Sequence, residues 1–249
     1  HLEFADGRSW CIVAVDYYST VAVSKLAGIM KLVETDASRK TANKTCRLSP
    51  EQKCFVILNQ NVMRVFAGEQ EVSIRSLAAP VSVQWNSGCQ EFQIPPGNGN
   101  ASVITNLMRL TQIICRKSES SGGLLVHAAL AEWNGTGVLL IGPSGVGKTT
   151  ASARMIAPWR SLSDDRALVV RDVSGGYRAH PMPTWSRFLF NGPGGRWDVQ
   201  RSVPLKALFF LSQANENQCR PISTTQTVRQ LFAAAIQASL APSLFACQL

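Results

Sequence analysis

The chain has 249 residues, of which 45% are hydrophobic and 16% charged, and it carries a formal net charge of +9 with an isoelectric point near 9.5. This composition is typical of a globular protein that buries a core, and it excludes a disordered or fibrous chain. No apolar segment approaches the roughly 20 residues that cross a bilayer, and the first residues lack the charged and apolar regions of a signal peptide, so we expect a cytoplasmic protein.

The positive charge favours anionic partners such as nucleotides, acidic peptides or nucleic acid. The basic residues are scattered, and their one local cluster, at residues 39–47, lies in a polar stretch typical of a solvated loop rather than of a nucleic-acid site. The seven cysteines are widely spread and form no CxxC pair, unlike the usual zinc and redox motifs. We expect most of them to be reduced and several to be buried as small apolar residues.

Residues 1–122 predict a small α+β module of unknown role. Apolar and β-branched runs predict strands at 8–15, 54–59 and 62–67 and a hairpin that joins 81–85 to 91–94. Ser19 and Asn100 are typical caps of two helices. The expected apolar faces are Ala22, Leu26, Ile29, Met30 and Val33 in the first helix and Ile104, Leu107, Met108, Thr111 and Ile114 in the second. Proline and glycine at 95–100 and a polar run at 116–123 place the domain boundary between 95 and 122.

Residues 123–249 form the second predicted domain, which carries the functional signals. A strand at 124–133, a hairpin turn at 134–137 and a strand at 138–141 lead to the sequence Gly-Pro-Ser-Gly-Val-Gly-Lys-Thr-Thr at 142–150. This sequence fits the pattern of glycine, four residues, glycine, lysine, and serine or threonine. A helix is expected from 149 to 156, so the loop joins a strand to a helix, as in phosphate-binding loops.

Each residue type in this loop suits phosphate binding. The glycines allow backbone amides to point at an anion, which also gains from the helix dipole. Lys148 can reach the β- and γ-phosphates, and the Thr149 hydroxyl can ligate Mg2+. A glycine-rich turn without a ligand is the alternative interpretation. The residues predicted to bind the nucleotide are Gly142, Ser144, Gly145, Val146, Gly147, Lys148, Thr149 and Thr150.

Two adjacent carboxylates, Asp164 and Asp165, follow a predicted strand at 160–163, which would deliver them to a strand end near the phosphates. One carboxylate can hold Mg2+ while the other accepts a proton from an attacking hydroxyl. His127, in the strand at 124–133, is a candidate neighbour of this pair. A solvated turn for the aspartates and an ordinary core or surface position for the histidine are the alternatives.

A loop over the phosphate site is predicted at 179–188 and 191–195, because their prolines and glycines exclude a long helix. Arg187 or Arg196 could neutralise charge that develops on a transferred phosphoryl group. A plain connecting loop is an equally open interpretation.

The C-terminal segments predict a further strand at 204–211 and an amphipathic helix at 227–240, used for core packing or an oligomer contact. The residues expected on one face of that helix are Val228, Leu231, Phe232, Ala235 and Ile236. The chain begins without Met and stops inside the apolar run 243–249, so a missing C-terminal element is a further expectation.

Four motifs follow one another from His127: the run His-Ala-Ala-Leu-Ala, the strand Gly-Val-Leu-Leu-Ile at 137–141, the loop at 142–149, and Ser-Asp-Asp-Arg at 163–166. Their order and spacing resemble the catalytic domain of HPr kinase/phosphorylase. Thr149 stands where that family has serine, and Ala-Ala replaces Gly-Val after the histidine. Residues 1–122 do not resemble the usual N-terminal domain. The chain is therefore similar to divergent members that occur beside peptide natural-product genes, such as lasso-peptide kinases.

The resemblance implies an α/β P-loop domain with a mixed sheet, of the fold shared with phosphoenolpyruvate carboxykinase. It also implies transfer of the γ-phosphoryl group of ATP to a serine of a small protein. Carried over by position, Lys148 and the loop bind the triphosphate, Thr149 ligates Mg2+, and Asp165 lies near the metal. Asp164 is implied as the proton acceptor and His127 as a neighbour of both carboxylates, although the residues leave open which aspartate is the base.

We therefore expect a kinase that uses ATP and Mg2+ and acts on a serine hydroxyl of a peptide or small protein. Two alternatives stay open: a non-catalytic nucleotide-binding accessory protein that presents a peptide to another enzyme, and a small-molecule kinase. Neither a membrane nor a nucleic acid is an expected partner, and a homo-oligomer is compatible with the sequence.

Overall fold

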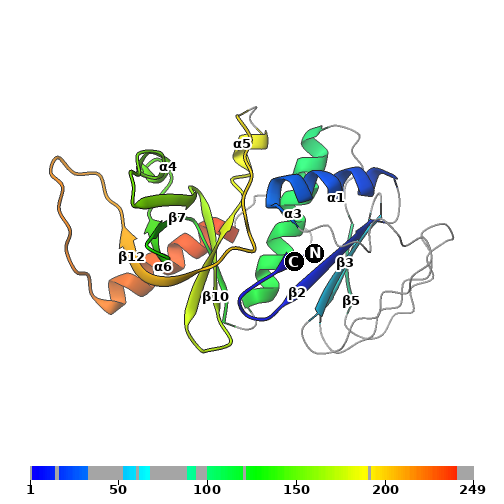
Figure 1. Ribbon diagram of the computed structural model, residues 1–249, viewed down its shortest axis with the longest axis horizontal. Coiled ribbons are helices and arrows are strands. Elements are labelled where there is room, and N and C mark those ends of the chain that lie inside the picture. Colours follow the sequence, from blue (N-terminus) through cyan, green and yellow to red (C-terminus); the bar gives the residue numbers. More distant parts are fainter. Residues whose placement is uncertain are drawn as a thin grey trace.

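The computed structural model describes residues 2–14, 17–32, 53–59, 62–67, 89–93, 100–119, 122–189 and 192–239. These residues form a mixed α/β structure with two sheets, one of five strands and one of seven, in opposite halves of the molecule (Figure 1). Within these ranges no helix is both long and apolar enough to cross a membrane.

The five-stranded sheet belongs to the N-terminal half, and its strands follow one another in chain order. Strands β2 and β3 pair in parallel, and the other neighbours are antiparallel. The strands predicted at 8–15, 54–59 and 62–67 are confirmed, whereas the expected partner strand at 81–85 lies outside the described residues. The five strands are β1 (Leu2–Glu3), β2 (Ser9–Ala14), β3 (Lys53–Asn59), β4 (Val62–Ala67) and β5 (Cys89–Gln93).

Two helices accompany this sheet, α1 (Tyr17–Met30) and α3 (Asn100–Glu119). Asn100 begins α3 as predicted, but the cap predicted at Ser19 is wrong, because α1 already includes Tyr17. The expected apolar face of α3 is confirmed by the burial of Ile104, Leu107, Thr111 and Ile114. Helix α3 lies between the two sheets, where this face meets both halves of the chain (Figure 1).

The seven-stranded sheet has the order β6-β10-β11-β12-β8-β7-β9. Only β12 and β8 pair in parallel, so the sheet is mixed. Strands β9 and β12 confirm the predictions at 160–163 and 204–211. The seven strands are β6 (Leu124–Val126), β7 (Ala128–Trp133), β8 (Thr136–Ile141), β9 (Trp159–Ser163), β10 (Arg166–Arg171), β11 (Tyr177–Met182) and β12 (Val203–Phe210).

The single strand predicted at 124–133 is wrong, because it is interrupted at His127 and forms the two strands β6 and β7. Strand β6 pairs with β10 at one end of the sheet, and β7 pairs with β8 and β9 at the other. The backbone N–H of His127 donates to the Ala234 carbonyl, 3.1 Å away in helix α6 (Thr224–Ser239). A continuous apolar pattern hides such a change of partner strands, which depends on contacts distant in sequence.

The hairpin between β7 and β8 confirms the predicted turn at 134–137. Asn134 and Gly135 have φ values of 48° and 78°, as a type I′ turn requires at both central residues. The register pairs Trp133 with Thr136, whose hydroxyl donates to the Trp133 carbonyl at 2.8 Å. This tight turn sets the register of β8, the strand that runs into the glycine-rich loop.

Strand β9 is held against β7 by ion pairs at the buried Glu132. The guanidinium groups of Arg160 and Arg201 both donate to its carboxylate, at 3.2 Å from Arg160 Nε and 2.8 Å from Arg201 Nη2. Burial by itself would raise the pKa of Glu132, but the two arginines outweigh it and the pKa is lowered. The rings of Trp133 and Trp159 stack across the same strand pair, 6.1 Å apart. These contacts fix the strand that leads into the paired aspartates.

One apolar core connects the two halves of the described chain. It includes Trp10 and Leu26 from the N-terminal half, the apolar face of α3, and Leu168 and Trp185 from the C-terminal half. A second core lies between the seven-stranded sheet and α6 and includes Leu130, Leu139 and Ala234. The division predicted near 95–122 therefore separates two sheets that share buried contacts.

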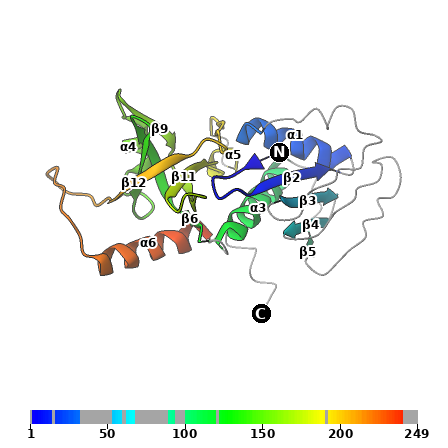
Figure 2. The ribbon, with the colours of Figure 1, turned by 60° about the horizontal axis from the view of Figure 1, so that its bottom comes forward.

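Helix α6 runs beside the seven-stranded sheet and follows a long connection from β12 (Figure 2). Its predicted face is wrong in part. Ala234 and Ala238 are buried, whereas Val228, Phe232 and Ile236 are 60%, 67% and 43% exposed. The helix approaches β6 through small side chains, so the larger apolar residues beside them remain in water.

Gly123 precedes β6 where the chain passes close to the end of α3. A Cβ atom at this position would lie 2.7 Å from the Ser118 carbonyl oxygen, and a backbone atom cannot move aside as a side chain can. We expect Gly123→Ala to lower the free energy of unfolding by about 1–3 kcal/mol in urea titrations. Gly28→Ala is the matched control, since its Cβ would meet nothing within 4 Å and an interior helix position gains about 0.5–1 kcal/mol. Equal stabilities of the two variants would contradict this assignment.

Candidate functional site

The glycine loop, residues 142–150, leaves the end of β8 and leads into α4 (Lys148–Ala153). The helix predicted at 149–156 is shorter than expected. Gly145 and Gly147 have φ values of 79° and 112°, which favour glycine over residues with a Cβ. A Cβ on Gly142 would lie 3.2 Å from the Leu211 carbonyl oxygen, because the parallel strand β12 runs alongside. These three glycines are therefore required by the backbone of the loop.

Lys148 folds back across the glycine loop. Its ammonium donates to the carbonyl oxygens of Gly142 and Pro143, at 2.8 and 3.0 Å, and the residue is 5% exposed. Burial lowers the pKa of Lys148, and the Asp165 carboxylate acts in the opposite direction. The charge thus lies inside the loop, within electrostatic reach of Asp165.

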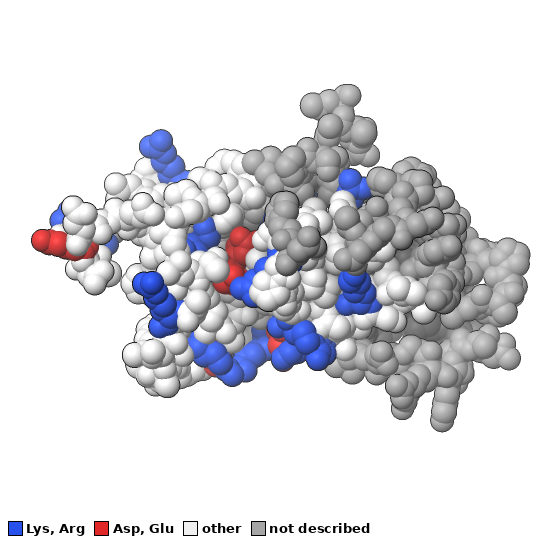
Figure 3. All heavy atoms as spheres, turned by 90° about the horizontal axis from the view of Figure 1, so that it is seen from above, with Lys and Arg blue, Asp and Glu red and all other residues white. Residues whose placement is uncertain are grey.

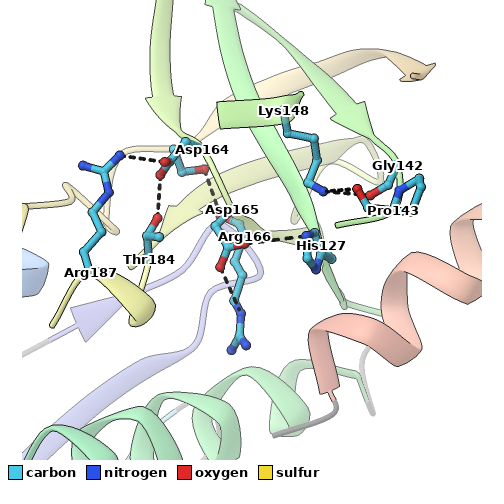
Figure 4. Close-up of polar contacts among 10 residues, drawn as sticks. His127, Gly142, Pro143, Lys148, Asp164, Asp165, Arg166, Thr184 and Arg187 are labelled. Atoms are coloured by element: carbon cyan, nitrogen blue, oxygen red, sulfur yellow. Dashed lines mark hydrogen bonds and ion pairs between the residues drawn. The ribbon is translucent and has the colours of Figure 1, made fainter. Parts of the chain in front are cut away.

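Asp164 is buried between two donors. The Thr184 hydroxyl donates to Oδ1 at 2.5 Å and Arg187 Nη2 donates to Oδ2 at 2.6 Å, while the carboxylate side chain is only 7% exposed. Both donors belong to the segment after β11, on the far side of the carboxylate from Lys148 (Figure 4). Asp164 is thus the more enclosed of the two aspartates, and each of its oxygens already has a partner.

Asp165 faces the opposite way, toward His127 and the glycine loop (Figure 4). Its Oδ1 lies 3.6 Å from His127 Nε2 and its Oδ2 lies 3.6 Å from Arg166 Nε, distances too long for hydrogen bonds. Burial lowers the pKa of His127; Asp165 raises it, and the charges of Lys148 and Arg166 lower it further. The sequence prediction that His127 neighbours a carboxylate is thus met at Asp165.

Thr149 and Asp165 are residues of the site that could take part in holding a metal ion. Within the described ranges, no group of three or more His, Cys, Asp or Glu side chains could hold a metal ion. Mg2+ typically uses one or two protein ligands together with phosphate oxygens and water. Thr149, which is exposed in the loop, and Asp165, 28% exposed at its side chain, carry oxygen donors of the type that Mg2+ uses.

The loop predicted at 179–188 is wrong in part, since β11 extends to Met182 and the short helix α5 (Ser186–Leu189) follows. Pro181 lies in β11 although it has no N–H to donate. The pairing with β12 does not reach this proline, because it involves only Arg178 and Ala179 of β11. Arg187 reaches Asp164, but Arg196 donates from Nε to the Gly28 carbonyl of α1 at 2.9 Å. Of the two candidate arginines, only Arg187 is shown bound to an aspartate of the site.

His180 is a structural residue of the interior, 1% exposed in β11. The Ala5 N–H donates to Nε2 at 3.1 Å, and Nδ1 lies 2.7 Å from the Val199 carbonyl oxygen. An acceptor at Nε2 and a donor at Nδ1 require the neutral ring with its proton on Nδ1. This histidine joins the first turn of the chain to the seven-stranded half.

Acidification should destabilise the protein through His180. Burial lowers its pKa from 6.5 to about 4, so between these values the unfolded chain binds a proton that the folded protein does not. The unfolding free energy contributed by this group is therefore complete above pH 6.5 and is lost as pH falls toward 4, by about 3 kcal/mol in total. Urea titrations across this range should show that loss in the wild type. In His180→Gln the free energy of unfolding should depend less on pH. Parallel curves would exclude the assignment.

Two residues of the site were not assigned a role from the sequence. Thr184 carries no local signal, because a threonine between proline and tryptophan is ordinary in a loop. Arg166 was visible only as the last residue of Ser-Asp-Asp-Arg, and its position beside Asp165 follows from the turn into β10. Seen from above, basic side chains are scattered over the described part of this face, and acidic ones lie at its left tip and near its middle (Figure 3).

Comparison with known proteins gives one family. No curated protein matches the chain. The model of the ScmC family, described as SynChlorMet cassette protein ScmC, matches residues 93–246, which run from the end of β5 beyond α6 and include the glycine loop, His127 and both aspartates. Because this match covers more than half of the chain, the protein belongs to the ScmC family of SynChlorMet cassette proteins.

Proposed function

We propose that this protein is a kinase of the HPr kinase-like type, which transfers the γ-phosphoryl group of ATP to a serine hydroxyl of a peptide or small protein. The observation that carries the proposal is the arrangement of Lys148, Asp165 and His127. A buried ammonium in a glycine-rich loop lies within electrostatic reach of a carboxylate, and an imidazole lies beside that carboxylate. Phosphoryl transfer requires these groups: cations near the phosphates and a proton acceptor for the attacking hydroxyl.

The glycine loop would hold the triphosphate. Gly145 and Gly147 have backbone conformations in which successive amides can point into one concavity, and anions bind in such concavities. Lys148 would exchange its two carbonyl acceptors for phosphate oxygens and offset their negative charge. Mg2+, held with the nucleotide by Thr149, would supply further neutralisation of phosphate charge.

Asp165 is the better candidate for the proton acceptor. Asp164 has both oxygens engaged and little exposure, whereas Asp165 has neither oxygen in a hydrogen bond to a described residue and faces the loop. A serine hydroxyl that attacks the γ-phosphoryl group would pass its proton to Asp165, or to His127, whose pKa is lowered by burial.

The acceptor class rests on the family. Its description as a cassette protein supports a partner made by the same cassette, so we propose peptides of that cassette as the first acceptors to test. The proposal also places the reaction in the cytoplasm, where ATP and Mg2+ are present.

The experiment is calorimetric titration of Mg2+·ATP into the purified chain, followed by mass spectrometry after incubation with ATP and serine-containing peptides of the cassette. We expect binding and the addition of one phosphate to a serine. Tight binding without transfer to any cassette peptide would favour an accessory nucleotide-binding role. Transfer only to free hydroxy compounds would instead identify a small-molecule kinase.

A further inference from the structure

The two adjacent aspartates differ in what holds them. Asp164 is fixed by Thr184 and Arg187, while Asp165 has no hydrogen bond of its own to a described residue. They form the two-residue connection between β9 and β10, which is closed by a 2.8 Å hydrogen bond from the Ser163 hydroxyl to the Arg166 carbonyl. In so short a connection, the direction of one side chain constrains the direction of the next.

The two donors come from a braced segment. Trp185, between Thr184 and Arg187, is 2% exposed in the core that connects both halves of the molecule. The Trp197 ring lies 6.1 Å from the Phe188 ring and 5.9 Å from the Arg187 guanidinium. The backbone N–H of Trp197 donates to the Ile29 carbonyl at the end of α1, 2.7 Å away. Thr184 and Arg187 are thus held from the N-terminal half.

We propose that Thr184 and Arg187 are positioning residues, which hold Asp164 and thereby keep Asp165 turned toward Lys148 and His127. The kinetic consequence of this role rests on the proposed function. Arg187 then acts through Asp164 and does not contact the transferred phosphoryl group. The N-terminal half contributes to the geometry of the site, because it contacts the segment that carries both donors.

The test is a double-mutant cycle on the full chain, with wild type, Arg187→Met, Asp164→Asn and the double variant. We expect kcat to fall about 10- to 100-fold in Arg187→Met, because a misplaced reacting group costs this much, with KM for ATP unchanged. In the Asp164→Asn background the same substitution should cost less than about twofold, because the two residues act as one unit. Losses that multiply in the double variant would overturn the proposal.

Further variants separate positioning from general loss of structure. Arg187→Lys should recover part of kcat, since it keeps a cation near Asp164. Arg171→Met is the control, because it removes an exposed arginine at the other end of β10, where its Nε donates to the Gly175 carbonyl, and it should leave kcat unchanged. Thr184→Val and Thr184→Ser repeat the comparison if Arg187→Met does not fold, and only the valine variant should lose kcat.

Urea unfolding of the four proteins of the double-mutant cycle gives a result that does not depend on phosphoryl transfer. The midpoint should fall in Arg187→Met, which leaves a buried carboxylate without its cation, and fall much less when Asp164 is already asparagine. Additive shifts would overturn the positioning role even if transfer occurs. Absence of transfer in the wild type would overturn the proposed function alone, because the unfolding cycle still measures whether Arg187 acts through Asp164.

Discussion

Replacing Lys148 by alanine is expected to raise the dissociation constant for Mg2+·ATP about 10- to 100-fold. The lost ammonium would bond charged phosphate oxygens, an interaction that contributes about 1.5–3 kcal/mol. Lys148 already lies inside the glycine loop, bonded to the Gly142 and Pro143 carbonyls, so it need only exchange acceptors when the nucleotide enters. Calorimetric titration measures the change directly.

Two controls accompany this prediction. Lys148→Met keeps the aliphatic stem, so a loss of binding as large as in Lys148→Ala assigns the effect to the charge. Lys206→Ala removes an exposed lysine of β12 and should leave the dissociation constant unchanged. Equal affinity of wild type and both Lys148 variants, with all proteins folded by circular dichroism, would show that the glycine loop does not bind the triphosphate.

Replacing Asp165 by asparagine should lower kcat by about 100- to 10,000-fold, the range that a positioned proton acceptor contributes. Asparagine keeps the shape of the side chain and removes its basicity, so nucleotide binding should change much less than kcat. Asp164→Asn should be less damaging, because that carboxylate is held by Thr184 and Arg187 and does not face the loop. Steady-state kinetics, with formation of the phosphorylated acceptor followed by mass spectrometry, give kcat and the KM for ATP.

The control for this pair is Asp172→Asn. Asp172 lies in the exposed turn after β10, at the other end of that strand from the site, and accepts hydrogen bonds from Ser174 and Gly176. It should leave kcat unchanged. If Asp164→Asn abolished transfer and Asp165→Asn preserved it, the roles of the two aspartates would be reversed.

The site was predictable where its parts are local. The glycine loop follows from one run of nine residues, since its required φ values are a property of those residues and of the strand before them. The candidate pairing of His127 with a carboxylate came from the spacing of motifs in a family resemblance. The sequence did not predict that Asp164 and Asp165 have different surroundings. The residues that hold Asp164, Thr184 and Arg187, lie 20 and 23 residues away from it in the chain.

Elements whose causes lie within a few residues could be predicted from the sequence: the Asn134 turn with its left-handed φ, the buried face of α3, and the strand that enters the glycine loop. Contacts between distant segments set the rest. They interrupt the predicted strand at His127 and leave Val228, Phe232 and Ile236 of α6 exposed. They also turn Asp165, and not Asp164, toward Lys148. Local conformation follows from backbone sterics and from the period of apolar residues, which neighbouring side chains express directly. The partner of a strand, a helix face or a carboxylate is set by which distant surfaces meet, and only the folded chain brings those surfaces together.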